Sequence, residues 1–256
     1  MDESTQSPEA HSFAALRAGA APTDRPLIRI GGFSMLLAGI LVLMVVVTSN
    51  RMGPPPPGDS LAYLQSVAAR PGIAMANFVL YSLSDLLVVL ALPGLFLAFR
   101  RTARTPMVVA LGLLAAYLAV DLAVTELNSV VLVTLARHLT AATGSTEQLA
   151  YLSAAGYALA TLPPATFFSY LVSSLGFLIV ALVMLRRGFG RWISILGIVA
   201  FLLGIAGAFY IFVPLLALLL IPCLVAFGLW LVLAGVRLYQ LAAPEASLQG
   251  DTGEAA

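Results

Sequence analysis

The sequence contains no lysine, and charged residues of all kinds make up only 10% of its 256 residues. Soluble domains carry roughly 25% charged residues, whereas 61% of this chain is hydrophobic. A water-soluble domain cannot bury that much apolar surface. The apolar residues also come in runs of about 20, the length that crosses a bilayer. The composition therefore excludes a soluble globular protein and indicates an integral membrane protein whose main partner is the lipid bilayer.

Cysteine and histidine are nearly absent as well. Cys223 is the sole cysteine, so neither an intrachain disulfide nor a thiolate metal cluster can form. His11 falls in the leader and His138 in a predicted outer connection, so the two histidines do not suggest a metal site. The chain also lacks the HExxH, nucleophile-elbow, Walker and GxGxxG patterns. The sequence therefore predicts no metal and no cofactor, and it favours a non-enzymatic protein.

The apolar runs predict an all-α fold, a polytopic membrane helix bundle with six transmembrane helices. The last two runs are nearly continuous, but together they are too long to cross a core of ~30 Å once, and Pro214 marks the expected turn between them. Terminal segments 1–26 and 242–256 lack periodicity and are predicted to be disordered. The six predicted spans are residues 27–49, 72–99, 107–133, 166–185, 192–212 and 216–238.

The arginines give the expected orientation, because positively charged loops stay on the cytoplasmic side. Ten arginines fall on the side of the two termini and only Arg51, Arg70 and Arg137 on the other. The bias predicts cytoplasmic N and C termini. All 13 basic residues are arginine, a usage typical of a GC-rich bacterial genome, so we expect a multi-pass protein of the bacterial cytoplasmic (inner) membrane. The net charge of +1 gives no indication of nucleic acid binding.

Two connections are expected on the outer side, residues 50–71 and 134–165. Prolines 54–57 should form a short polyproline II spacer, and residues 60–69 should form a short surface helix. In the second connection, Ser145 and Gln148 have the spacing of a capping box ahead of a predicted surface helix. Pro163 and Pro164 are expected to end that helix before the fourth span.

Two aspartates fall near the centres of predicted spans. Asp85 precedes Arg100 by 15 residues and Asp121 follows Met107 by 14, so both are expected ~21 Å from the cytoplasmic boundary at about 1.5 Å per residue. An aspartate at this depth costs about 2.5 to 3.5 kcal/mol on insertion. No arginine falls inside a span, so neither aspartate has a predicted intramembrane cation as a partner. Each must be protonated, share a proton, face a wet cavity, bind a cation or accept hydrogen bonds.

Polar residues at helical spacing place other side chains beside these aspartates. Ser173 on the fourth span falls at the same depth, with Ser169 four residues before it on the same face. Glu126, about 140° around its helix from Asp121, is expected to face water. The candidates for ligand binding or proton handling are Asp85, Asp121, Tyr81, Asn77, Ser84, Tyr117, Thr125, Asn128 and Ser173, and no residue is assigned a catalytic role.

Three explanations of this polar layer remain open. It can bind a small ligand or ion, it can belong to a small proton-coupled transporter, or it can only hold the helices together through hydrogen bonds. An intramembrane enzyme is a further alternative, although only the aspartates with Ser84 or Ser173 could serve it. Ladders of small residues, Ala200, Gly204 and Ala208 on one span and Ala115, Ala119 and Ala123 on another, suggest close packing within the chain rather than a dimer interface, and homo-oligomerisation is left open.

Three short stretches resemble a known bacterial membrane protein family. They are Arg29-Ile30-Gly31-Gly32, Ser84-Asp85-Leu86-Leu87 and Gly228-Leu229-Trp230-Leu231. Over residues 27–240 the chain is similar to the six-helix family called domain of unknown function 4386. The resemblance implies a membrane location and six helices, and it implies no activity and no catalytic residues.

Overall fold

The computed structural model describes residues 13, 16–17, 21–52 and 59–243. Predictions for His11, for the polyproline spacer, and for most of the two terminal segments fall outside these residues. The described chain is helical throughout, with no strand, and six of its segments are long and apolar enough to cross a membrane. The predicted all-α bundle of six membrane helices is therefore confirmed.

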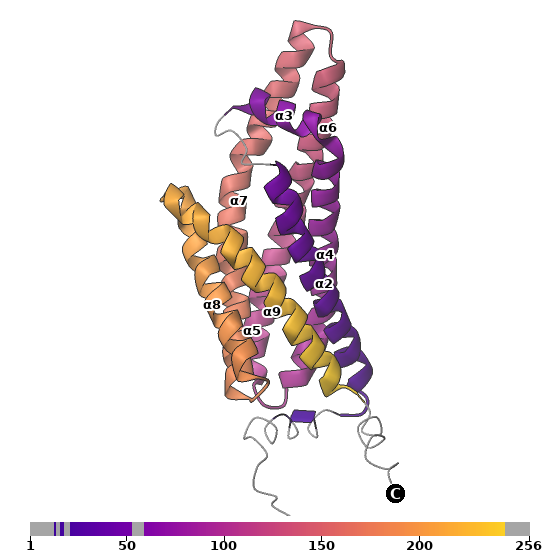
Figure 1. Ribbon diagram of the computed structural model, residues 1–256, viewed down its shortest axis with the longest axis vertical. Coiled ribbons are helices and arrows are strands. Elements are labelled where there is room, and N and C mark those ends of the chain that lie inside the picture. The colour runs from indigo at the N-terminus through magenta and orange to yellow at the C-terminus, as the bar shows by residue number, and fades with distance from the viewer. Residues whose placement is uncertain (1–12, 14–15, 18–20, 53–58, 244–256) are drawn as a thin grey trace, which may run out of the picture.

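The spanning helices form an elongated bundle (Figure 1). The first two spans are α2 (Arg25–Met52) and α4 (Pro71–Phe99). The third consists of α5 (Arg104–Val120), η2 (Asp121–Glu126) and α6 (Leu127–Ala141) in one continuous run. The fourth is α7 (Ser145–Arg186). The last two are α8 (Arg191–Ala208) and α9 (Leu220–Leu241), joined through the 3-10 turns η3 (Phe209–Ile211) and η4 (Pro214–Leu219).

The turn between the last two spans begins where the sequence predicts it, since Val213 is extended and Pro214 opens η4. The short surface helix is also confirmed: α3 comprises Ser60–Ala69. The side chain of Asp59 accepts a hydrogen bond from the backbone of Ala62 at 3.0 Å and caps this helix, as N-cap aspartates do.

The prediction of a break at Pro163 and Pro164 is wrong, because α7 runs through both prolines for 42 residues. With α6 it forms a helical hairpin that projects beyond the other spans (Figure 1). Neighbouring helices can satisfy the backbone groups that a proline frees, and α7 packs against α6 along this stretch. The capping box is also absent: Gly144 is the N-cap, and Gln148 donates instead to the carbonyl of Ala142.

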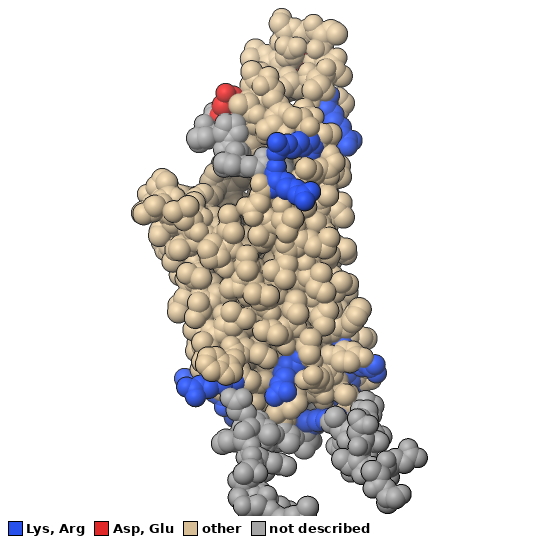
Figure 2. All heavy atoms as spheres, in the orientation of Figure 1, with Lys and Arg blue, Asp and Glu red and all other residues tan. Residues whose placement is uncertain are grey.

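Arginines mark the two ends of the bundle and are absent from its middle on the face seen in Figure 2. The arginine-rich end carries the start of α2 and the end of α9, together with the loops after α4 and α7. The arginine-poor end carries Arg51, Arg70 and Arg137. Between the ends, many large apolar side chains such as Leu90, Val108 and Leu202 are exposed, as expected for side chains that face lipid.

The described part of the leader contacts the bundle at the arginine-rich end. Asp24 forms an ion pair with Arg100 at 2.7 Å, Leu16 is buried, and the guanidinium of Arg237 lies 3.9 Å from the ring centre of Phe13. These residues, predicted to be disordered, are packed against the ends of the helices.

Glycines bring α2 into close backbone contact with both α4 and α9. A Cβ atom added at Gly39 would lie 2.6 Å from the carbonyl of Gly228, and one added at Gly235 would lie 2.5 Å from the backbone nitrogen of Leu36. At Gly94, a Cβ atom would lie 2.7 Å from the carbonyl of Leu27. Small residues permit such close approach between membrane helices, so α2 is the helix on which its two neighbours pack.

The two predicted ladders of small residues differ in their outcome. Ala200, Gly204 and Ala208 on α8 are buried within the chain, as expected. The ladder of Ala115, Ala119 and Ala123 is exposed, so the prediction of intrachain packing is wrong for this helix, because its opposite face makes the contacts with α7.

Candidate functional site

A cavity of about 280 Å³ lies among the helices, at the depth of the two buried aspartates. One water molecule needs roughly 10 to 15 Å³ on this measure, so the cavity has room for a small organic molecule. Side chains from α2 to α9 line it, and α3 contributes Tyr63 and Val67. Asp85 is the middle residue of α4, so the polar layer lies roughly 21 Å from either end of that helix at about 1.5 Å per residue.

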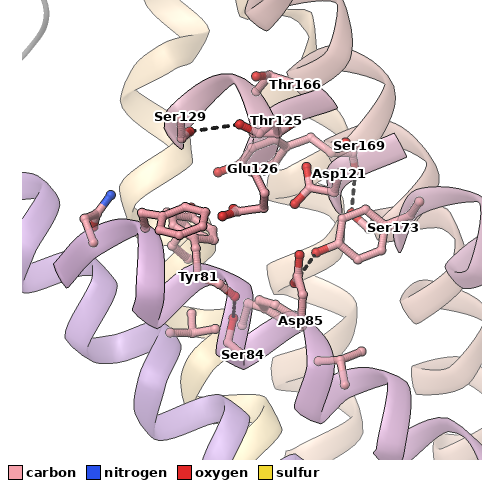
Figure 3. Close-up of a pocket in the computed structure, with 18 of the residues that line it drawn as sticks. Tyr81, Ser84, Asp85, Asp121, Thr125, Glu126, Ser129, Thr166, Ser169 and Ser173 are labelled. Atoms are coloured by element: carbon pink, nitrogen blue, oxygen red, sulfur yellow. Dashed lines mark hydrogen bonds between the residues drawn. The ribbon is translucent and has the colours of Figure 1, made fainter. Parts of the chain in front are cut away.

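Three carboxyl groups converge in this cavity. One carboxylate oxygen each from Asp85, Asp121 and Glu126 lies within 4.8 Å of the other two, and all three residues are buried. Figure 3 shows the three carboxyl groups turned toward a common space. Within the described lining residues there is no arginine and no histidine. The cavity therefore concentrates acidic groups without a basic side chain to balance them.

The expectation that Glu126 faces water is wrong, and the reason lies in the backbone. Residues Asp121–Glu126 form a π-helical turn, η2, in which hydrogen bonds run from residue i to i+5. The wider turn brings side chains five positions apart toward one face, whereas an α-helix would separate them by about 140°. Glu126 is only 6% exposed and shares the cavity with Asp121. Short π-helical insertions occur frequently at functional sites.

Hydroxyl groups hold two of the three carboxyls. Tyr117 donates a hydrogen bond of 2.8 Å to one oxygen of Asp85, and Ser82 donates one of 2.6 Å to Glu126. The other oxygen of Asp85 is buried and has no hydrogen-bond partner among the described residues. The carboxyl group of Asp121 lies within 4.8 Å, so a proton shared between the two carboxyl groups can satisfy this oxygen in the empty cavity.

A second unsatisfied group lies on the opposite wall. Ser169 on α7 lines the cavity, is only 3% exposed, and its hydroxyl has no partner within the described chain. The hydroxyl of Thr125 on η2 is likewise buried without a partner. Buried hydroxyls usually find a hydrogen bond. Polar groups on both walls thus remain open to a molecule in the cavity.

Eight of the nine candidates from the sequence line this cavity. Asn77, Tyr81, Ser84 and Asp85 come from α4. The others are Tyr117 on α5, Asp121 and Thr125 on η2, and Ser173 on α7. Asn128 is the exception, because it donates to the hydroxyl of Thr161 at 2.8 Å and links α6 to α7 away from the cavity.

The sequence did not single out several other lining residues. Glu126 lies off the polar face that a regular α-helix predicts. Ser82 donates to Glu126 without lining the cavity itself, and it is not among the predicted candidates although it precedes Asp85 by three residues. Cys223, to which the sequence assigns no role in a site, is buried and lines the cavity. Of the aromatic lining residues, Tyr81 and Tyr117 are predicted candidates. The others give no signal in the sequence, since aromatic residues occur throughout the apolar spans; they are Tyr63, Phe78, Tyr170, Phe177, Phe201 and Phe227.

The two ends of the cavity are closed differently. Toward the arginine-rich end, Phe177, Phe201 and Phe227 pack on Trp230 with ring centres 5.0 to 6.5 Å apart. Toward the arginine-poor end, α3 covers the cavity through Tyr63 and Val67. Burial raises the pKa of the Tyr63 hydroxyl above its ordinary value, so this hydroxyl stays neutral and adds no charge to the cavity.

The fold and the cavity together define a class: a six-helix membrane protein with an acidic, aromatic-lined cavity at mid-membrane depth. The comparisons with known proteins do not narrow this class, because no family model, no curated protein and no solved structure matches the chain.

Proposed function

We propose that this protein binds a small ligand or ion that carries positive charge, in the cavity around Asp85, Asp121 and Glu126. The observation that carries the proposal is the convergence of three buried carboxyl groups with no basic residue among the described lining. Two carboxylates at this separation repel each other by at least about 3.5 kcal/mol at an effective dielectric constant near 20. The cluster therefore holds protons when it is empty and exchanges them for a cation.

The open polar atoms support binding over a purely structural role. A cluster that only held helices together would satisfy its own hydrogen bonds, whereas the hydroxyls of Ser169 and Thr125 have no partner in the described chain. A structural cluster would also need no space of about 280 Å³ beside it, because protein interiors are normally close-packed.

Binding can be tested on the purified protein in lipid nanodiscs. Sodium, potassium, magnesium, calcium, zinc and a series of alkylammonium ions would be added in turn, with the melting temperature and the protons released into a weakly buffered solution as readouts. We expect at least one cation to raise the melting temperature and release protons. The matched variants are a triple substitution, Asp85→Asn with Asp121→Asn and Glu126→Gln, which should lose both effects, and Glu147→Gln on the exposed part of α7, which should keep them. If no cation acts on the wild type, the proposal fails.

Transport is a second candidate, favoured by the exchange of protons for a cation that the cluster implies. The π-helical turn also interrupts one span at the level of the cavity. Many carriers have a matched pair of broken helices, and the described residues contain no such pair. Uptake of a cation that binds, driven by a proton gradient in reconstituted vesicles, would identify a proton-coupled transporter. Binding without uptake would leave the protein as a receptor or sensor of its ligand.

The cellular setting is proposed with the function. From the three sequence motifs we also propose membership of the domain of unknown function 4386 family. We expect the protein in a bacterial cytoplasmic membrane, with the arginine-rich end facing the cytoplasm. Orientation can be measured with single cysteines in a Cys223→Ser background. A membrane-impermeant maleimide on intact cells should label Gln65→Cys on α3 and leave Thr105→Cys at the start of α5 unlabelled, and the reverse pattern would overturn the orientation.

A further inference from the structure

The size and the lining of the cavity indicate more about the ligand than its positive charge. Its volume is far larger than a bare ion needs. Most of the space beyond the carboxyl cluster is bordered by aromatic and aliphatic side chains, among them Phe78, Val88 and Phe227. An inorganic cation would fill only the acidic part and leave the apolar part empty. A ligand with both a charged group and an apolar body would occupy the whole cavity.

The arrangement of the three carboxyl groups fits a primary ammonium group. Such a group has three N–H donors in tetrahedral directions, and charge-assisted N–H···O bonds are about 2.7 to 2.9 Å long. Three acceptors around one ammonium nitrogen therefore lie roughly 4.6 Å from one another. The three carboxylate oxygens of Asp85, Asp121 and Glu126 lie no farther than 4.8 Å from one another, so they are close enough to contact one ammonium nitrogen together. The free oxygen of Asp85 is available as one of these acceptors.

The same groups are less suited to coordinate a divalent metal ion. Magnesium and zinc bind oxygen at about 2.0 to 2.2 Å and require four to six ligands. The cluster provides three carboxyl groups, and the remaining polar groups near it are neutral hydroxyls such as those of Ser169 and Thr125. Hydrated ions also gain little from an aromatic lining, whereas organic cations are attracted to aromatic faces.

From these observations we infer that the ligand is a primary organic amine in its ammonium form, with its N–H groups on Asp85, Asp121 and Glu126 and its apolar body against the aromatic lining. This inference rests on the proposed function, which it makes more specific. The free hydroxyl of Ser169 gives the ligand's body one further polar contact.

Charge balance fixes the proton exchange that accompanies binding. One ammonium group neutralises one carboxylate, and a carboxyl group that keeps its proton still accepts a hydrogen bond through its carbonyl oxygen. Uptake of RNH₃⁺ with release of one carboxyl proton leaves the net charge of the cavity unchanged. Binding therefore releases one proton per amine and tightens as the pH rises, until the amine itself loses its proton near pH 10.

The experiment is calorimetry on the full chain in lipid nanodiscs with methylammonium, butylammonium and benzylammonium, together with benzyl alcohol and benzyltrimethylammonium. The alcohol has no charge, and the quaternary ion has charge but no N–H donor. We expect the best primary amine to bind at least tenfold more tightly than either control, with one proton released per molecule bound. Asp85→Asn should weaken that amine at least tenfold, whereas Glu147→Gln should leave its affinity unchanged.

The other possible results of this experiment would overturn the inference alone, or the inference together with the proposed function. Equal binding of benzyltrimethylammonium and the primary amines would overturn the assignment of the three N–H donors. Binding of a metal ion with no binding of any amine would overturn this inference while the proposed function survives. Absence of binding by every cation, with no proton released, would overturn both. If Asp85→Asn fails to fold, Glu126→Gln serves the same comparison, because Glu126 lies on the other helix of the cluster.

Discussion

Asp121 shows how a buried acid in this cavity affects stability and binding in opposite directions. It lies within 4.8 Å of Asp85 and Glu126 and is only 6% exposed, so it adds repulsion and desolvation to the empty protein. We predict that Asp121→Asn leaves the free energy of unfolding unchanged or raises it by about 1 kcal/mol, since binding sites commonly sacrifice stability. Thermal denaturation of the ligand-free protein measures this effect.

The same substitution separates a binding cluster from a structural one. If the polar layer served only to hold the helices together, loss of Asp121 would lower the melting temperature by several degrees. A matched control is Ser82→Ala, which removes the hydroxyl that donates to Glu126 at 2.6 Å and should destabilise the protein, because it leaves a buried carboxyl with one partner fewer.

Sequence reasoning placed most of these residues and missed one that matters. Asp85 and Tyr81 are four residues apart on α4, and Tyr117 and Asp121 are four apart on the next span, so helical spacing alone put each pair on one face. Glu126 could not be placed in this way, since the π-helical turn depends on tertiary packing and leaves no periodic pattern in the sequence.

At the scale of elements, the glycines of α2 and its neighbours are the most sensitive positions in the packing. A methyl group at Gly39 or Gly235 would approach backbone atoms of the facing helix to 2.6 and 2.5 Å, and backbone cannot move aside as a side chain can. We predict that Gly39→Ala and Gly235→Ala each destabilise the protein by about 2 kcal/mol, as overpacking does. The measurement is the melting temperature in detergent.

Gly112 on α5 provides the control for this prediction. It is exposed, and a Cβ atom added there would meet nothing within 4 Å, so Gly112→Ala should be neutral or stabilise the helix by about 0.5 to 1 kcal/mol. Equal destabilisation at Gly39 and Gly112 would show that helix propensity, and not close backbone contact, sets the effect.

The π-helical turn predicts how the third span responds to deletion of a single residue. A π turn accommodates one residue more than the α-helix around it, so removing one residue from η2 should restore regular α-helix without rotating α6 against α5. We predict that deletion of the exposed Ala123 gives a folded protein with Asp121 and Glu126 now four apart and still on one face. Size-exclusion chromatography and thermal denaturation check the fold.

Deletion of Ala116 is the matched control, because it is also exposed but lies in the regular helix α5. Its loss would turn every later residue of the span by about 100° and should prevent folding. If both deletions behaved alike, η2 would not be the element that sets the register between the two halves of this span.

Some helices and turns can be predicted from the sequence, whereas others depend on tertiary packing. The spans, α3 and the turn at Pro214 followed from runs of apolar residues and from local turn chemistry. The passage of α7 through Pro163 and Pro164 did not, since local propensity opposes it and only packing against α6 explains it.

At the scale of the whole molecule, different amounts of protein cover the two ends of the cavity. Aromatic rings around Trp230 fill the bundle toward the arginine-rich end, whereas the single short helix α3 covers the arginine-poor end. Its side chains Leu64 and Val67 are buried against the tops of α4, α6 and α7. A ligand therefore has less protein to displace on the arginine-poor side.

Cys223 allows this asymmetry to be measured, because it is the sole thiol in the sequence and lines the cavity. Methanethiosulfonate reagents that carry an ammonium group, no charge or a sulfonate group would be added at the arginine-poor side of oriented vesicles. We predict that the ammonium reagent modifies Cys223 at least tenfold faster than the sulfonate reagent, since an acidic cavity concentrates cations and repels anions.

In the Asp85→Asn and Asp121→Asn double variant the two rates should converge, and Cys223→Ser should abolish labelling. Faster modification from the arginine-rich side would contradict entry past α3, and equal rates for the charged reagents would contradict an acidic cavity open to cations.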